Sequence, residues 1–458
     1  LGTWLSPAEY TAQYVTRREL NPEVPEMSKH YQFETGMSVT GSNADARIQI
    51  KPSQERLILA GLYNTLARAA GQTVYAAPSS PVSIGDLVDE LMSHKGRSLV
   101  VSGSDDPGVQ QLVNEINFML GNYGETIDFS KTLNLRKGET RDMIRLVEDM
   151  NTGKVNALLC FNVNPVYDFP LSGRFEEGLG KVGLTVSFAC QPDETAARTK
   201  YVCPDNHYLE SWNDAQPRTG FFSLQQPVIQ TLFETRQTQE CLLKWCGHKE
   251  DFHAFLQSYW KKNIHPRQRA YKGFEDFWNH TLQDGVFEIS GKSGRQPDIR
   301  HEGLKAVMDA TGKSGSPDDI ELQVYESVGL GTGKDANNPW LMELPDPVTK
   351  LTWDNAACIS PALAKRMGFI QGEMIRINEL IDLPVLIQPG QADYTVSVAA
   401  GYGRTHSGKV ATGVGSNAAS MRAFQDGGIM NFTSKVNLVS TGMFMELALT
   451  QEHHSMEG

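Results

Sequence analysis

Two asparagines, Asn162 and Asn164, follow the short apolar run 157–161, which predicts a buried strand. In open α/β sheets, ligands bind beyond the carboxyl ends of the strands. Side-chain amides at that place can donate hydrogen bonds to a ligand and accept hydrogen bonds from it. Asn164 also precedes Pro165, however, and an Asn-Pro pair often only makes a turn. The spacing alone favours the turn over a binding site.

Glycine-rich stretches are the next features whose residue types could bind a ligand. Gly401-Tyr-Gly-Arg404 lacks the third glycine of a dinucleotide fingerprint, and no apolar strand leads into a helix there. We interpret it, and Gly413-Val-Gly415, as turns between strands. Gly291-Lys-Ser-Gly294 lacks the preceding glycine and strand of a phosphate-binding loop. No nucleotide site is therefore predicted.

Cysteine and histidine offer no metal-binding pattern. Six cysteines are too few for a disulfide framework, and none forms a Cys-x-x-Cys pair. Cys241 and Cys246 lie in a helical pattern, where ordinary thiols are the simpler interpretation. His248, His253 and His265 are spaced wrongly for one metal-binding face. We expect no metal and no iron–sulfur cluster in this segment.

Composition narrows the class of protein. A chain of 458 residues exceeds one core, so two to four domains are expected. The net charge of −12 argues against nucleic acid as a partner. No apolar run approaches the ~20 residues of a membrane span, so any membrane association requires partner subunits. The chain begins without Met and stops soon after the apolar run 442–449, so we expect an interior piece of a longer polypeptide.

In residues 51–200, predicted strands alternate with predicted helices, and these elements would position Asn162 and Asn164. Apolar runs predict strands at 98–102, 157–161 and 184–189. Helical patterns begin at Ser53, at Asp106-Pro107 and near Thr140. This alternation predicts a parallel α/β sheet.

The later part of the chain changes character twice. Residues 201–338 are rich in tryptophan, with helices expected near 237–246, 251–262 and 274–282 and a loop at 289–318. From 339 onward, short strands and turns dominate. Ser360 is expected to cap a helix that Gly368 ends, followed by a strand at 374–377. We predict four parts: an irregular segment 1–50, an α/β domain 51–200, a helical and loop segment 201–338, and a β-barrel 339–458.

Several of these motifs resemble the molybdopterin oxidoreductase superfamily. The resemblance covers most of residues 30–458 and rests on Asn164-Pro165, Glu194-Thr195-Ala196, Pro204, Glu210, Arg218-Thr-Gly220, Gln225–Ile229 and the block 339–377. It implies a Rossmann-like parallel-sheet domain and a C-terminal barrel of the double-psi kind, similar to a molybdopterin-dinucleotide-binding domain.

Further motifs resemble one branch, the large iron–sulfur subunit of bacterial alternative complex III, a quinol:electron acceptor oxidoreductase. They are Tyr31, Thr40–Arg47, Pro389-Gly-Gln391, Gly401–Thr405 and His453–Gly458. The branch implies a structural, non-catalytic module without molybdenum cofactor, joined to a C-terminal half that carries iron–sulfur clusters. Haem c and quinol-binding membrane subunits would be its partners, on the periplasmic side of the bacterial inner membrane.

Two alternatives stay open. The chain could be a fragment of a catalytic molybdopterin-dependent enzyme of the polysulfide or tetrathionate reductase type, because the family's metal ligand lies upstream of the matched region. If pterin binds, the resemblance points to Asn162, Asn164, Glu194, Asn355 and Gln388 as its contacts. An unrelated nicotinamide-dependent enzyme is disfavoured, since no Gly-x-Gly-x-x-Gly follows a strand.

Overall fold

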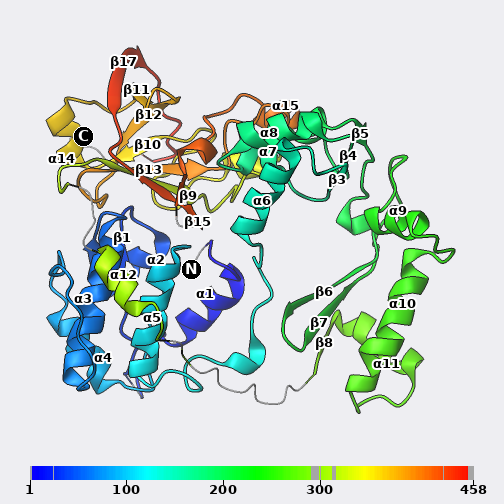
Figure 1. Cartoon of the computed structure of the whole chain (residues 1–458), viewed down its shortest axis with the longest axis horizontal. Helices are drawn as coiled ribbons and strands as arrows, with labels where there is room; N and C mark the ends of the chain where they lie inside the picture. The colour runs from blue at the N-terminus through cyan, green and yellow to red at the C-terminus, as the bar shows by residue number, and fades with distance from the viewer. Residues whose placement is uncertain are drawn as a thin grey trace. The chain divides into compact units, whose positions relative to one another are not determined.

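The chain divides into two compact units, shown within Figure 1. The computed structural model describes residues 3–23, 25–289, 299, 301–311, 316–425 and 428–451. Unit 1 comprises Leu1–Thr126, Tyr167–Ser172 and Ile299–Gly458, and unit 2 comprises Ile127–Val166 and Gly173–Asp298. The motifs 291–294 and 453–458 lie outside the described residues. The four-part division of the chain stays a prediction.

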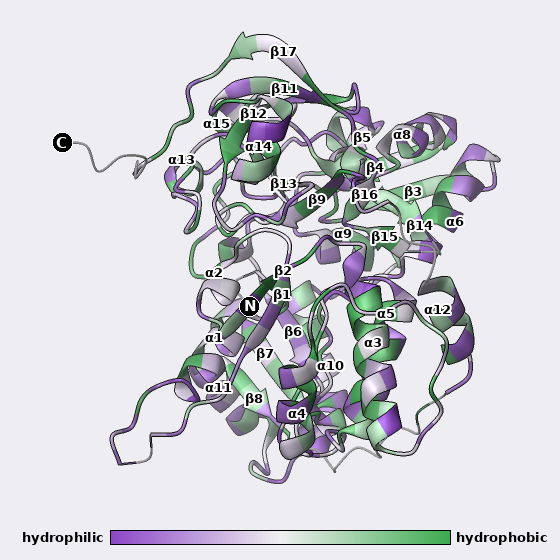
Figure 2. Cartoon of the chain, turned by 90° about the vertical axis from the view of Figure 1, so that its left-hand side faces the viewer, coloured by the Kyte–Doolittle hydropathy of each residue, from purple (hydrophilic) through white to green (hydrophobic). Residues whose placement is uncertain are grey.

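Unit 1 contains a helical layer in which α3 (Gln54–Ala69) and α5 (Pro107–Met119) pack side by side. α4 (Gly85–Ser93) and α12 (Leu304–Thr311) complete the layer, and α12 lies beside the earlier helices although it comes much later in the chain (Figure 1). Figure 2 shows hydrophobic and hydrophilic residues alternating along α3 and α5. The apolar residues build a core around Leu66, Leu112 and Ile116. The helices predicted from Ser53 and from Asp106-Pro107 are confirmed, including the cap by Asp106, whose carboxylate accepts hydrogen bonds from the N–H groups of Gly108 and Val109. The loop predicted at 289–318 is wrong at 304–311, where Leu304 and Met308 pack α12 into this core.

The strand predicted at 98–102 is wrong: these residues form no strand. The backbone N–H of Val100 donates to the side chain of Asn117 at 3.0 Å, and the Asn117 amide donates to the Val100 carbonyl at 2.7 Å. Asn117 lies on α5 and is buried, so a helix side chain replaces the neighbouring strand as hydrogen-bond partner. Leu99 and Val101 are more than half exposed.

The second part of unit 1 is a mixed sheet of seven strands, in the order β16-β9-β13-β10-β12-β11-β17. Its pairs β9/β13 and β10/β12 are parallel, and the other pairs are antiparallel. The strands are β9 (Glu321–Glu326), β10 (Ala357–Ile359), β11 (Glu373–Ile377), β12 (Ile381–Ile387), β13 (Thr395–Ala400), β16 (Phe432–Ser434) and β17 (Leu438–Phe444).

One helix, α14 (Pro361–Met367), closes the core of this sheet. The Ser360 hydroxyl accepts a hydrogen bond from the Leu363 N–H at 2.9 Å, and Gly368 ends the helix in the left-handed conformation. Leu363 is fully buried among Ile375, Val385 and their neighbours. The predicted helix and the strand that follows it are therefore confirmed.

Smaller elements complete unit 1. They are α1 (Pro7–Thr16), the parallel pair β1 (Tyr31–Glu34) and β2 (Ala46–Gln49), α2 (Val39–Ser42), α13 (Pro339–Glu343), α15 (Gly408–Ala411), and the hairpin β14 (Ala423–Gln425) and β15 (Gly428–Met430).

Unit 2 contains a parallel sheet, β3-β4-β5, that confirms two of the predicted strands. The elements of this part are α6 (Thr140–Asn151), β3 (Ala157–Cys160), the start of α7 (Pro165–Asp168), α8 (Ser172–Lys181) from residue 173, β4 (Leu184–Ser187) and β5 (Tyr201–Val202). The mixed α/β class with parallel sheets is thus confirmed.

The rest of unit 2 is an antiparallel sheet packed against helices around an aromatic core. Trp260 and Phe277 are fully buried there, and the Trp260 indole donates to Asp214 at 2.8 Å. The three helices predicted in this region are confirmed. The elements are β6 (Asn213–Arg218), β7 (Phe221–Gln225), α9 (Thr238–Trp245), α10 (Phe252–Asn263), α11 (Phe274–Asp284) and β8 (Val286–Glu288).

Candidate functional site

Asn164 and Glu194, two of the predicted site residues, meet in unit 2. The Asn164 amide donates to a carboxylate oxygen of Glu194 at 2.7 Å. The Asn164 side-chain oxygen accepts from both the backbone N–H and the hydroxyl of Thr195, at 3.0 and 2.7 Å. Glu194 and Thr195 are buried. This network connects the loop after β3 to the loop after β4, the edge where ligands of parallel sheets bind.

Asn162 does not join that network. It is exposed and adopts a left-handed backbone conformation, with φ of 55°. Asparagine tolerates this conformation better than most residues, which suits the sharp change of direction after β3. Its geometry is that of a turn residue.

Asn355 lies in unit 1 and is 1% exposed. Its amide nitrogen donates to the carbonyls of Ala399 and Ser416, both at 2.9 Å, and its oxygen accepts from the Ser416 N–H at 2.9 Å. Both N–H donors of the side chain are therefore used within the unit. The side chain holds the loop around Ser416 against the end of β13.

Gln388 follows β12 and has weaker connections. Its side chain donates to the carbonyl of the adjacent Pro389 at 3.0 Å and remains partly exposed. It shares none of the hydrogen-bond partners of Asn355. The structure therefore brings together Asn164 and Glu194, and it gives Asn355 and Gln388 separate surroundings in unit 1.

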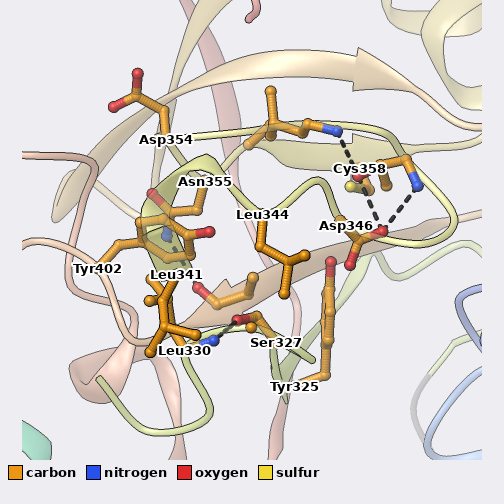
Figure 3. A pocket seen from close by; sticks show the side chains of 15 residues that line it. Tyr325, Ser327, Leu330, Leu341, Leu344, Asp346, Asp354, Asn355, Cys358 and Tyr402 are labelled. Carbon is orange, nitrogen blue, oxygen red and sulfur yellow. Dashed lines mark hydrogen bonds between the residues drawn. The ribbon is translucent and has the colours of Figure 1, made fainter. Parts of the chain in front are cut away.

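A small cavity in unit 1 was not foreseen from the sequence, although Asn355 lines it. Its volume is about 20 Å³, which holds roughly one water molecule. Polar groups surround it, as Figure 3 shows: Tyr325, Ser327, Asp346, Asp354, Cys358 and Tyr402. The Tyr325 ring points toward Asp346 (Figure 3), and Tyr325 and Cys358 affect each other's ionisation through a side-chain contact.

Burial controls the ionisation of the groups around this cavity. It raises the pKa of Cys358 to about 12, helped by the negative charge of Asp346. It also raises the pKa of Tyr402 to about 12 and that of Tyr325 well above its ordinary value. A thiol with that pKa is ionised in only on the order of one molecule in 10⁵ at pH 7. Cys358, Tyr325 and Tyr402 are therefore neutral hydrogen-bonding groups, not activated nucleophiles.

We also searched the described residues for side chains that could bind a metal ion. No group of three or more His, Cys, Asp or Glu side chains is arranged to hold an ion among the described residues. In the same part of the chain, no helix is long and apolar enough to cross a membrane.

Two comparisons connect this architecture to known proteins. No protein-family model matches the chain. A segment of 95 residues is 34% identical to the menaquinone reductase molybdopterin-binding-like subunit of Nitratidesulfovibrio vulgaris (strain Hildenborough). That match covers 20% of this chain and spans only 14% of the length of that subunit. The fold is similar to acetylene hydratase from Pelobacter acetylenicus, with a TM-score of 0.57 and 12% identity over 89% of this chain and 73% of that one.

The resemblance to the molybdopterin oxidoreductase superfamily is confirmed. The likeness extends across both units, because the aligned part includes most of the chain.

Proposed function

We propose that this chain is a structural, cofactor-free module of a respiratory quinol:electron acceptor oxidoreductase of the alternative-complex-III type. The similarity to a menaquinone reductase subunit described as molybdopterin-binding-like supports a place in quinol metabolism. In the proposed assembly, iron–sulfur clusters in an adjoining half of the polypeptide and haem c subunits transfer the electrons. Membrane subunits bind quinol, and the module lies on the periplasmic side of the inner membrane.

The observation that most favours the cofactor-free form is the hydrogen bonding of Asn355. A pterin needs donors and acceptors that protein groups do not already occupy, since unpaired buried polar groups are costly. Both N–H donors of Asn355 bind backbone carbonyls of its own unit. Asn164 likewise directs its oxygen to Thr195 and its nitrogen to Glu194.

The cavity that Asn355 lines is also too small for a pterin. A cavity of about 20 Å³ has room for one water molecule and not for a pterin ring. These observations support the cofactor-free form, and we assign no chemical step to a pterin. In this proposal the hydrogen bonds of the residues named as possible pterin contacts hold loops in place.

We also propose that the seven-stranded sheet is a barrel of the double-psi kind. The two parallel pairs β9/β13 and β10/β12, joined through the antiparallel pair β10/β13, support this interpretation. An experimental structure of the full-length subunit tests it directly, because a double-psi barrel requires a closed sheet in which two parallel loop-and-strand motifs interlock.

The decisive experiment on function is metal and pterin analysis of the purified full-length protein in its complex. We expect iron and haem but no stoichiometric molybdenum, tungsten or pterin. One metal with its pterin per chain would instead establish the catalytic alternative, a polysulfide or tetrathionate reductase type of enzyme.

A second experiment substitutes Asn164, Glu194 and Asn355 by Ala, one at a time, in the whole complex. We expect any loss of quinol oxidation to follow loss of assembled complex, as measured by the subunit content of the purified material. Asn151→Ala is the matched control, because this half-buried asparagine also bonds to backbone carbonyls but is not a candidate pterin contact. Intact assembly with abolished quinol oxidation would reveal a redox site and contradict the proposal.

A further inference from the structure

Two segments of unit 2, 204–206 and 235–238, lie side by side through three hydrogen bonds. The Arg236 N–H donates to the Pro204 carbonyl at 3.2 Å, and the Thr238 N–H donates to the Asp205 carboxylate at 2.8 Å. The Thr235 hydroxyl donates to the side chain of Asn206 at 2.7 Å. The start of α9 is thereby fixed against the chain that leaves β5.

Cys203 and Cys241 flank this junction. Cys203 immediately precedes Pro204, and its N–H donates to the Ser187 carbonyl at 2.8 Å, which extends the pairing of β4 with β5. Cys241 lies three residues after Thr238 on α9, and residues three apart share one face of a helix. Cys241 lies close enough to Cys203 for the two thiols to interact electrostatically.

The packing brings the two thiols into one small apolar cluster. Val186, Phe188 and Cys241 form its buried part, and Cys203 packs against it. Cys241 is 9% exposed, whereas Cys203 is half-buried. The pKa of Cys241 is raised chiefly by burial, and Arg236, whose charge lowers it, opposes that effect.

We propose that Cys203 and Cys241 form a disulfide when the protein meets a disulfide oxidant, either a small-molecule disulfide or that of a thiol oxidoreductase. The more exposed Cys203 loses its proton to solvent and attacks the oxidant, releasing one reduced thiol. Cys241 then loses its proton and attacks the Cys203 sulfur of the mixed disulfide. The second oxidant thiol leaves, so the two cysteines lose two electrons and two protons, and the oxidant is reduced to two thiols.

Such a bond would close a loop that exposes several large apolar side chains. The chain between the two cysteines includes β6 and β7 and also exposes Tyr208, Val228, Leu232 and Phe233 by 62–77%. A disulfide that closes this loop reduces the freedom of the unfolded chain and thereby stabilises the loop. The cross-link would therefore preserve this surface in an oxidising compartment.

The test exposes the full-length protein to oxidised glutathione and then counts free thiols by alkylation and mass spectrometry. We expect a peptide pair that links Cys203 to Cys241 and a rise in melting temperature of about 4 °C or more, reversed by reductant. Cys203→Ser should leave Cys241 alkylatable and abolish the rise. Circular dichroism and the melting temperature under reducing conditions verify that this variant folds.

Cys246→Ser is the matched control, because Cys246 also lies at α9 but is exposed and outside the cluster. It should retain the Cys203–Cys241 link and the full rise in melting temperature. Alkylation is carried out after the oxidised protein is denatured, so that buried thiols react. Two outcomes overturn the proposal: both thiols are alkylated after oxidation, or Cys203 links to a different cysteine.

Discussion

Asn355 and Ser416 are joined by two hydrogen bonds of 2.9 Å, one in each direction, although 61 residues separate them. A backbone turn is thus held by a single buried amide side chain. The arrangement resembles a strand pair in which one partner is a side chain. Its loss would leave the Ser416 N–H and the carbonyls of Ser416 and Ala399 without this partner.

Asn355→Ala should therefore destabilise the protein by about 2–4 kcal/mol, because buried backbone groups lose their hydrogen bonds. The unfolding midpoint in urea measures the change. Gln388→Ala should change it by less than about 0.5 kcal/mol, since that side chain is partly exposed. Equal effects of the two substitutions would show that Asn355 does not anchor the turn.

Two glycines in the turns after β13, Gly403 and Gly413, differ in how much room surrounds them. Gly403 and Gly413 both adopt positive φ, of 68° and 80°. A Cβ atom on Gly403 would overlap the backbone nitrogen of Asn417, whereas one on Gly413 would meet nothing within 4 Å. Gly413→Ala should cost about 1 kcal/mol from backbone strain alone, and Gly403→Ala more than about 3 kcal/mol. Thermal unfolding distinguishes them, and similar melting temperatures would argue against the close approach.

The pair Glu115–His301 gives unit 1 a pH dependence. His301 Nδ1 lies 2.9 and 3.0 Å from the two carboxylate oxygens of Glu115, which is 2% exposed. Burial raises the pKa of Glu115 above its ordinary value of 4.5, and His301 opposes that rise. Because the folded-state pKa is the higher one, stability falls as pH rises from below 4.5 through the folded-state value.

His301→Ala should raise the pKa of Glu115 further. The variant should be nearly as stable as the parent near pH 4, where Glu115 is protonated, and less stable by about 1–2 kcal/mol at pH 7. Urea unfolding at the two pH values measures this difference. A stability loss that is the same at both would show that His301 acts by packing against Phe118 and not through the carboxylate.

The features that could be predicted from the sequence are those whose causes are local. Helix α14 begins at a serine cap and ends at a left-handed glycine, and both signals lie within a few residues of the element. Asn164 stays a predicted site residue, and the signal for it is also local, because it follows strand β3 by a few residues. The alternation of strands and helices likewise predicted the α/β class.

The features that could not be predicted depend on contacts between distant residues. Tyr325 and Cys358 meet because β9 and β10 both pair with β13, where Tyr325 lies opposite Ala399 and Cys358 opposite Ser397. No spacing within the sequence specifies that arrangement. The ion pairs of this segment depend on distant residues as well: Asp45 pairs with Arg18, 27 residues away, and Arg47 pairs with Glu34.

The segment 98–102 shows how a distant side chain can override a local pattern. Its apolar residues favour a strand, yet the backbone of Val100 pairs with Asn117 on α5. Asn117 in turn accepts a hydrogen bond from Asn122 at 2.9 Å and donates one to the Val113 carbonyl at 3.0 Å. Asn122 is fully buried, so the network has little access to water to replace a lost bond.

Asn117→Ala should therefore release the segment as well as destabilise α5. We expect a loss of about 2–3 kcal/mol and faster hydrogen exchange at the Val100 amide, measured by mass spectrometry. Asn151→Ala is a suitable control, because that asparagine also bonds to helix carbonyls but is only half-buried. Unchanged hydrogen exchange at Val100 in Asn117→Ala would show that a group other than Asn117 holds the segment 98–102 in place.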